Sequence, residues 1–282
     1  HLRTRRQRQM CIRDSILITG ASSGIGLETA VYLAKKNFVV YGCSRRLDRM
    51  QPIISAGGFA LKLDITKEND IIDVVEHIIK IENKIDVLWN NAGFGLWGAV
   101  EDISIDRAKY QFDVNLFGLA RMTKEVLPHM RKKNSGLIIN TSSVGGKIYT
   151  PLGSWYHSTK HAIEGWSDCL GFEVKKFGIN ISLLQPGMIV SEFGNIMLEN
   201  LEKNSKKSPY NKLNQAMMRG LKKNIQNTIG SHPIVVAKCV EKIILSKNPK
   251  KRYLVGYGAR SMLFVRSFFG DRIFELFIKA AG

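Results

Sequence analysis

The sequence of 282 residues lacks a long hydrophobic run. No stretch approaches the roughly 18 consecutive apolar residues that a membrane-spanning helix requires. The chain also lacks internal repeats, low-complexity blocks and linkers rich in Gly, Ser and Pro. Because 44% of its residues are hydrophobic, it can form one sizeable core. We therefore expect a single domain without a spanning helix.

Cysteine is scarce and scattered. The four cysteines form no CxxC pair and show no Cys/His spacing typical of a metal site. Cys43 and Cys169 lie in apolar stretches, where a free cysteine packs as a small hydrophobic side chain. We predict no bound metal and a reducing, cytoplasmic location.

Acidic residues are outnumbered, since 24 Asp and Glu stand against 42 Lys and Arg, for a net charge of +18. Such an excess is compatible with nucleic acid, an anionic membrane surface or an anionic substrate. The lysines, however, form scattered pairs and no stripe interleaved with aromatics, and no nucleic-acid-binding motif accompanies them. The pattern favours a solvated, lysine-rich surface, and we predict no nucleic-acid partner.

Residues 1–14 contain five arginines, but they have no Met at position 1 and no apolar segment typical of a secretory signal. They resemble translated read-through more than native protein, so we interpret them as a non-native or disordered leader. Their charge of +4 leaves about +14 of the +18 for residues 15–282, which we expect to form the domain.

Strands and helices are expected to alternate along the chain. Short apolar runs predict strands at 15–19, 38–41, 59–63, 85–89, 136–140 and 179–184. Apolar residues at helical spacing predict helices at 26–36, 70–81 and 107–131. This alternation is typical of an α/β, doubly wound, mostly parallel sheet of the Rossmann type, whose site lies at the carboxyl ends of the strands.

A glycine-rich turn, Thr19–Gly26, follows the first expected strand. Gly20, Gly24 and Gly26 let the backbone approach a pyrophosphate closely, and the N–H groups of the next helix would face that anion. The spacing G-xxx-G-x-G differs from the commonest dinucleotide fingerprint, so the turn alone is a weak signal.

Together with later motifs, this turn resembles the classical short-chain dehydrogenase/reductase family. The resemblance runs from about Ser15 to Phe193 and also includes Asp64, Asn90-Asn91-Ala92-Gly93, Asn115, Ser143, Tyr156, Lys160 and Pro186-Gly187, in that order. Segments 156–165 and 251–256 are similar to a branch with 17β-hydroxysteroid and retinol dehydrogenases and acyl-dihydroxyacetone-phosphate reductases. The family implies a nicotinamide-dependent oxidoreductase that interconverts a carbonyl group and a primary or secondary alcohol.

The resemblance assigns catalysis to Asn115, Ser143, Tyr156 and Lys160. Tyr156 and Lys160 are four residues apart and share one face of a helix, and Ser143 lies at the family's spacing before Tyr156. An ammonium at about 4 Å favours the phenolate, so we expect Lys160 to lower the pKa of Tyr156 by about two to three units. Tyr156 would be the general acid/base and Ser143 would bind the oxyanion. Asn115 would hold a proton-relaying water, and Lys160 would bind the nicotinamide ribose.

The end of the second expected strand indicates the cofactor. An acidic residue at this position would bind the ribose 2′-hydroxyl of NAD, whereas an arginine accommodates a 2′-phosphate. Here Ser44 takes the acidic position and Arg45 and Arg46 follow it. The missing acid favours NADP(H) over the alternative that these arginines form only a solvated turn.

Further cofactor contacts are implied by the resemblance alone. Asp64 would contact the adenine, Asn91, Ala92 and Gly93 the adenosine ribose, and Ile189 the carboxamide. The remaining expected contacts are Gly20, Ser22, Ser23, Gly24, Ile25, Gly26, Tyr156, Lys160, Pro186, Gly187 and Ser191, the last where the family usually has Thr.

The substrate is the least determined part. Residues 193–230 are expected to form a helical lid, and the side chains of Phe94, Leu96, Trp97, Tyr149, Leu152 and Trp155 to line an apolar pocket for a hydrophobic, lipid-like carbonyl or alcohol. The apolar segment 260–282 suits a membrane-surface helix, buried core or the seam of a homo-oligomer. Two alternative functions stay open: a 3-oxoacyl-thioester reductase and a non-catalytic NADPH-binding sensor.

Overall fold

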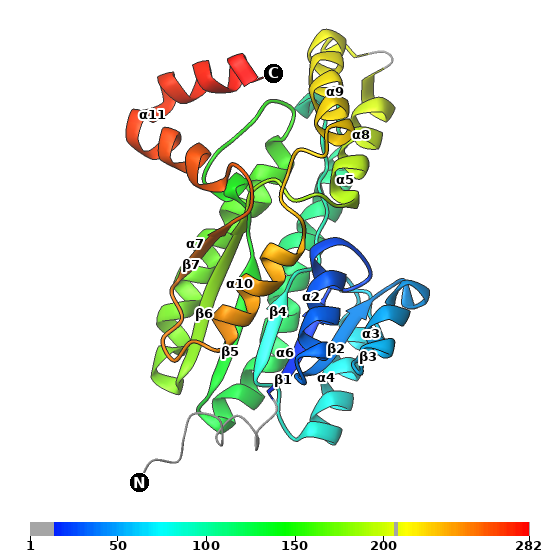
Figure 1. Cartoon of the computed structure of the whole chain (residues 1–282), viewed down its shortest axis with the longest axis vertical. Coiled ribbons are helices and arrows are strands. Elements are labelled where there is room, and N and C mark those ends of the chain that lie inside the picture. Colours follow the sequence, from blue (N-terminus) through cyan, green and yellow to red (C-terminus); the bar gives the residue numbers. More distant parts are fainter. Residues whose placement is uncertain (1–13, 206–207, 282) are drawn as a thin grey trace.

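The computed structural model describes residues 14–205 and 208–281, and its strands form one sheet with the order β3-β2-β1-β4-β5-β6-β7 (Figure 1). Every paired strand runs parallel to its neighbour. The predicted doubly wound sheet is thereby confirmed. Its strands are β1 (Ser15–Thr19), β2 (Val39–Ser44), β3 (Phe59–Lys62), β4 (Val87–Asn90), β5 (Gly136–Thr141), β6 (Ile179–Pro186) and β7 (Arg252–Val255).

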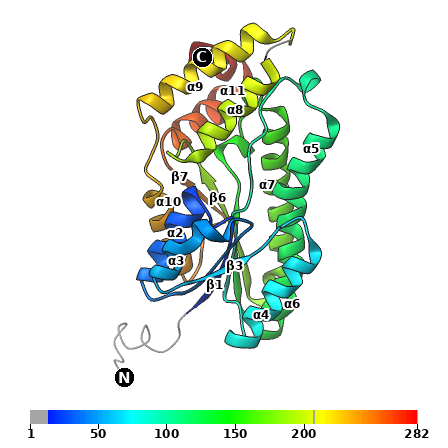
Figure 2. The ribbon, with the colours of Figure 1, turned by 90° about the vertical axis from the view of Figure 1, so that its right-hand side faces the viewer.

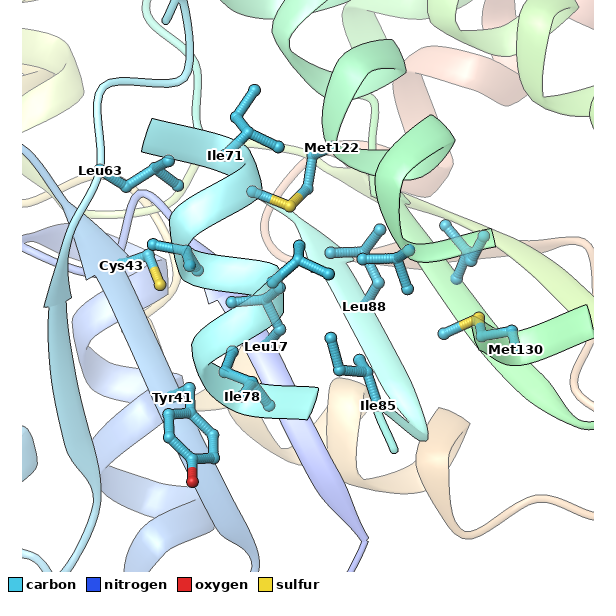
Figure 3. Close-up of a cluster of buried hydrophobic side chains, with 14 of the residues drawn as sticks. Leu17, Tyr41, Cys43, Leu63, Ile71, Ile78, Ile85, Leu88, Met122 and Met130 are labelled. Carbon is cyan, nitrogen blue, oxygen red and sulfur yellow. The ribbon is translucent and has the colours of Figure 1, made fainter. Parts of the chain in front are cut away.

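Helices cover both faces of the sheet (Figure 2). One face carries α2 (Gly24–Lys35), α3 (Gln51–Ser55) and α10 (Ile234–Ile244), and the other carries α4 (Glu68–Glu82), α6 (Gly118–Lys133) and α7 (Ser154–Val174). Side chains of a strand alternate between faces, so Ile16 and Ile18 pack toward α2 and α10, whereas Leu17 packs toward α4 and α6 (Figure 3). Both faces are apolar, which explains the near-continuous hydrophobic strands.

The helix predicted over residues 107–131 is wrong as one continuous element. Helix α5 (Ile105–Phe112) leads into a π-helical turn, Asp113–Phe117, and only then does α6 begin. Single π turns inside helices occur frequently at functional sites. This one carries Asn115, whose side chain is buried. Hydrophobic spacing did not reveal the turn, because helices border it directly on both sides and it contains no glycine or proline that would mark it in the sequence.

The apolar pattern did not predict α10 and β7 in the last third of the chain. It also missed the short helix α3 earlier in the chain. Helices α8 (Glu192–Ser205) and α9 (Asn211–Gln226) lie at the carboxyl end of the sheet, where the lid was expected (Figure 1). Helix α11 (Ala259–Ala281) is broken at Gly270, which has φ 70° and ψ −169°. Within the described residues, no helix combines the length and apolar character needed to cross a bilayer.

The interpretation of residues 1–14 as a foreign leader lies almost wholly outside the described residues. Asp14, the one described member, accepts a hydrogen bond from Val39 N at 3.2 Å through its carbonyl oxygen. It therefore already pairs with β2 at the edge of the folded region.

Candidate active site

The glycine-rich turn Thr19–Gly26, called the nucleotide turn below for the cofactor it is expected to bind, lies between β1 and β4, where the strand order reverses. Doubly wound sheets bind ligands at this position. Gly20 has a φ of 71°, and a Cβ atom there would lie 2.7 Å from the Cα atom of Ala92. A Cβ atom on Gly26 would overlap the carbonyl oxygen of Gly20. Both positions therefore require glycine to keep the turn packed against the end of β4 with its backbone open to a ligand.

Hydrogen-bond donors gather where the nucleotide turn leads into helix α2. Ser23 precedes its first residue without a side-chain cap bond, and its first turn holds no acidic residue. Arg46 Nε and Nη2 lie 3.2 and 3.1 Å from Ser22 Oγ, and Nη2 lies 3.0 Å from Ser23 Oγ. Because the first amides of a helix also lack internal partners, amides, hydroxyls and a guanidinium converge on one spot. This cradle fits the phosphates of a nicotinamide dinucleotide.

Arg45 and Arg46 diverge from the end of β2. Arg46 N donates to Ser44 Oγ at 3.0 Å, which fixes this arginine on the side of the nucleotide turn. Arg45 Nη1 instead donates to Tyr110 Oη at 3.0 Å and lies near Asp64. Burial raises the pKa of Asp64, but hydrogen bonds from Thr66 and the charge of Arg45 outweigh burial, so the pKa falls below its usual value. The two arginines therefore border different parts of the candidate cofactor site.

Asn115 holds the turn that follows β4. Its Oδ1 accepts a hydrogen bond from Phe94 N at 3.0 Å, and its Nδ2 donates to Phe94 O at 2.9 Å and to Thr159 Oγ1 at 3.1 Å. A Cβ atom on Gly93 would lie 3.1 Å from Asn115 Oδ1. The Asn115 amide thus connects the π turn, the Asn91-Ala92-Gly93 segment and helix α7.

Helix α7 and the end of β5 bring Ser143, Tyr156 and Lys160 together. Ser143 hydrogen-bonds the Tyr156 phenol, and its Oγ also accepts from Gly145 N at 3.0 Å and donates to Pro186 O at 3.4 Å. Lys160 Nζ donates to Thr141 O at 2.8 Å and lies 5.8 Å from the centre of the Tyr156 ring. The choice of Ser143 as the serine beside Tyr156 agrees with this contact.

The expected effect of Lys160 on Tyr156 is wrong for this arrangement. Burial raises the pKa of Tyr156 to about 12, and the opposing effect of the Ser143 hydrogen bond is smaller. The ammonium is directed at Thr141 rather than at the phenol, and burial lowers the pKa of Lys160 to about 8, although nearby Glu164 raises it. Desolvation outweighs attraction here because both groups are enclosed.

Lys160 should make stability depend on pH. Its folded pKa lies below the ordinary value of 10.5, so above about pH 8 the unfolded chain binds more protons than the folded one. Between pH 8 and 10, the free energy of unfolding of the wild type should therefore rise relative to that of Lys160→Met, by up to about 1.4 kcal/mol per pH unit. Urea titrations without dinucleotide measure this difference, and parallel pH curves for the two proteins would contradict it.

Comparison with known proteins agrees with this geometry. The family model for short chain dehydrogenases matches residues 14–201, which is more than half of the chain. The chain belongs to the short-chain dehydrogenase/reductase family. It is therefore an oxidoreductase of carbonyl and alcohol groups with a nucleotide-binding Rossmann-like fold, as the resemblance implied.

Two curated relatives and one solved structure show which family members the chain is similar to. The chain is 38% identical to a 3-ketodihydrosphingosine reductase of Bacteroides thetaiotaomicron, over 86% of this chain and 87% of the relative. It is 38% identical to human retinol dehydrogenase 8, over 64% and 60%. A single-residue variant of the actinorhodin polyketide ketoreductase, solved with NADPH, superposes with a TM-score of 0.71 at 26% identity, over 86% and 95%. The predicted placement near the retinol and hydroxysteroid dehydrogenases is confirmed.

In this short-chain dehydrogenase, the turn after β6 closes the site from the far side. Gly187 N donates to Val255 O at 2.8 Å, and a Cβ atom on Gly187 would overlap Tyr257 O, so the turn packs tightly against the end of β7. Ile189 pairs with Ser231 in a short β-bridge. The Cβ of Ser191 would lie 3.4 Å from a Cβ on Gly24, which brings this turn to the nucleotide turn.

The aromatic residues predicted to form one pocket separate into three groups. Trp97 and Leu152 pack with Tyr156, and the Trp97 and Tyr156 ring centres lie 4.5 Å apart. Phe94, Leu96 and Trp155 join a neighbouring cluster, whereas Tyr149 contacts Phe274 of α11. The prediction of a single pocket is therefore wrong, and only the first group packs against Tyr156.

The lid contributes apolar contacts that the sequence reasoning missed. Its segment was interpreted as polar, yet one side of α8 and α9 packs onto the Trp97–Tyr156 cluster through Phe193, Met197, Leu201, Met217, Met218 and Leu221. The i, i+4 spacing of Met197 and Leu201 was the available signal. Tyr156 is only 8% exposed beneath these side chains. Helices α8 and α9 therefore cover the phenol of Tyr156.

Proposed function

We propose that this protein is an NADP(H)-dependent reductase that converts a carbonyl group into a primary or secondary alcohol, and the reverse, with Tyr156 as general acid/base. The observation that carries the proposal is the convergence of Ser143, Tyr156 and Lys160 beside a glycine cradle with Arg46 at its edge. When bound, the nicotinamide supplies or accepts the hydride.

The protein's own residues would manage the proton and the oxygen. In reduction, Ser143 would hydrogen-bond the carbonyl oxygen and stabilise the charge that develops on it. Tyr156 would transfer its phenolic proton to that oxygen, and Lys160 would stabilise the phenolate left behind once its ammonium turns from Thr141 O toward the phenol. A tyrosine whose pKa is raised to about 12 remains protonated at neutral pH, which is the form that reduction requires. Asn115 would keep the turn beside Gly93 in place.

The substrate is proposed to be hydrophobic and lipid-like. The surface that faces Tyr156 is formed by Trp97, Leu152, Phe193 and the lid methionines, and it offers a carbonyl compound apolar contacts. Methionines also adapt to flexible chains because their side chains are unbranched. The 3-ketodihydrosphingosine reductase and retinol dehydrogenase among the relatives support the same class by name.

A panel of carbonyl substrates tests this function, with NADPH oxidation followed by its absorbance over the course of turnover. Long-chain keto lipids and retinoid aldehydes should be reduced faster than 3-oxoacyl thioesters or small ketones. Tyr156→Phe serves as the blank. Preferential thioester reduction would favour the alternative reductase, and no turnover above the blank with any substrate would favour a non-catalytic sensor.

Arg46→Ala should weaken NADPH binding by about 10- to 100-fold, because it removes charge-assisted hydrogen bonds to a 2′-phosphate. NADH lacks that phosphate and should bind with little change. Arg45→Ala should weaken NADPH less, because its guanidinium is directed at Tyr110 and Asp64. Fluorescence titrations with both cofactors measure the effect. Equal losses for NADPH and NADH would contradict the assignment.

The C-terminal helix is proposed to contact an anionic membrane surface. Apolar side chains are exposed along α11 at Phe264, Phe268, Phe269, Ile273 and Leu276. Helices α9 and α11 together hold eight basic and two acidic residues, and both lie at the end of the molecule that carries the lid (Figures 1 and 2). Exposed aromatics beside excess positive charge are typical of helices that bind anionic lipid headgroups.

The double variant Phe264→Ser/Phe268→Ser should reduce binding to vesicles of phosphatidylcholine and phosphatidylserine by at least about tenfold, since two buried aromatic contacts are lost. Co-sedimentation measures the bound fraction, and salt should lower it further. Phe172→Ser is the matched control, because Phe172 is 75% exposed on α7. The proposal would be contradicted if the wild type does not bind the vesicles and instead forms a dimer that the double variant disrupts. A second copy of the chain would then cover this face.

A further inference from the structure

Helix α8, the first of the two lid helices, is joined at its first residue to the candidate cofactor site by two ion pairs. Glu192, which begins α8, places Oε1 2.9 Å from Arg49 Nη1 and Oε2 3.7 Å from Arg46 Nη1. Within the described part of the chain, no other acidic side chain forms an ion pair with either arginine. Glu192 therefore neutralises charge at the edge of the cradle while belonging to the lid.

These pairs are weak enough to be exchanged. The three side chains are 44–47% exposed, and ion pairs of such exposure contribute about 0–1 kcal/mol. Arg46 at the same time uses Nε and Nη2 to bond Ser22 and Ser23, so its orientation does not depend on Glu192. A dianionic phosphate at this position would form stronger charge-assisted hydrogen bonds than a single carboxylate. Phosphate and Glu192 would thus compete for one guanidinium.

Glu192 is followed directly by a residue that covers the catalytic tyrosine. The ring centre of Phe193 lies 5.5 Å from that of Tyr156 and 5.7 Å from that of Trp97. A shift of the first turn of α8 would move Phe193 and open a path to the buried phenol. The start of the lid therefore controls access to Tyr156.

The C-terminal half of α8 and the segment between α8 and α9 are held by separate contacts. Ser208 Oγ donates to Asp102 Oδ2 at 2.6 Å, and Tyr210 Oη donates to Glu101 Oε2 at 2.9 Å. Arg107 Nη2 also donates to Asn200 Oδ1 at 2.8 Å. Loss of the Glu192 pairs would consequently free the first turn of α8 without detaching the lid.

We propose that Glu192 is an internal anion that holds the lid closed, and that a 2′-phosphate bound at Arg46 displaces it and frees the first turn of α8. The inference rests on the proposed NADP(H) dependence. Its consequence is an order of binding in which the dinucleotide enters first and prepares the lid for the substrate. NADH, without a 2′-phosphate, would leave the Glu192 pairs intact.

Amide hydrogen exchange and calorimetry with two nucleotides test this directly. Adenosine 2′,5′-bisphosphate carries the 2′-phosphate, and ADP does not. In the wild type, the bisphosphate should speed exchange in residues 192–199, and ADP should not. In Glu192→Gln, exchange in this segment should already be fast, and the bisphosphate should bind about two- to fivefold more tightly than in the wild type. Glu199→Gln makes the same charge change two turns along α8 and should behave like the wild type.

The outcomes separate the two proposals. In one outcome, the wild type prefers the bisphosphate while exchange in residues 192–199 is unchanged and Glu192→Gln binds no more tightly. This result would overturn the role of Glu192 as a latch, that is, as the anion that holds the lid closed, and the cofactor assignment would stand. If neither the wild type nor Glu192→Gln prefers the bisphosphate over ADP, the cofactor assignment fails and the latch fails with it. A preference that emerges only in Glu192→Gln would support competition between the carboxylate and the phosphate.

Discussion

Tyr156→Phe is expected to lower kcat for carbonyl reduction by about 10³-fold, within the usual range of 10²- to 10⁴-fold for a lost general acid. The substitution removes only the phenolic hydroxyl, which lies beside Ser143 and is the proposed proton donor. The neighbouring ammonium of Lys160 is directed at Thr141 O and cannot replace it without leaving that carbonyl. Single-turnover measurements with saturating NADPH give the chemical step directly.

The fold of Tyr156→Phe should remain intact. The ring keeps its packing against Trp97 and Phe193, and one lost hydrogen bond costs about 1 kcal/mol. Dinucleotide affinity and thermal unfolding therefore serve as controls within the same variant. Tyr149→Phe is a matched control, because it removes a hydroxyl that bonds Asp271 and Glu275 rather than the site. Comparable activity losses in both variants would contradict the catalytic assignment of Tyr156.

The sheet was predictable from the sequence because its strands are buried on both faces. A strand such as β1 has no side exposed to solvent, so its central apolar run stands out without knowledge of the fold. Strand β7 was missed because Arg252 and Tyr253 at its start leave only a short apolar run at the sheet edge. The π turn was missed because it lies between two helices that follow one another without a break, and its difference from them is in backbone hydrogen bonding.

The site residues that belong to a local sequence motif could be predicted. Contacts between residues far apart in the sequence could not. Tyr156 and Lys160 lie four residues apart on one helix, and the family resemblance placed Ser143, which lies shortly before them, beside this pair. The Glu192–Arg49 pair joins residues 143 positions apart, and no sequence pattern reports it. The pKa of Tyr156 was predicted in the wrong direction because spacing reveals neighbours but not burial.

A second long-range feature that the sequence does not reveal is a network of ion pairs and hydrogen bonds around Glu164 of helix α7. Glu164 lies one turn after Lys160 and is 3% exposed. Its Oε1 accepts from Gln185 Nε2 at 2.9 Å, and its Oε2 pairs with Arg252 Nε at 2.9 Å and Lys147 Nζ at 3.3 Å. One buried carboxylate thus joins α7 to β6, β7 and the segment after Ser143.

Glu164→Ala should therefore destabilise the protein by about 3 kcal/mol, the lower end of the range for breaking a buried ion pair. The loss stays at that end because Arg252 keeps Asp168 at 2.6 Å and both cations reach solvent. The midpoint temperature of thermal unfolding should fall by roughly 6–10 °C. Glu173→Ala, at an exposed position of the same helix, should change stability by less than about 0.5 kcal/mol.

Glu164→Ala should also affect the ionisation of Lys160. Glu164 raises the pKa of Lys160 against the larger lowering by burial, so its removal should lower that pKa further below about 8. The activity lost as Lys160 deprotonates should then disappear at a lower pH in Glu164→Ala than in the wild type. A variant as stable as Glu173→Ala, with an unchanged alkaline limb, would show that the network neither holds the strands together nor influences Lys160.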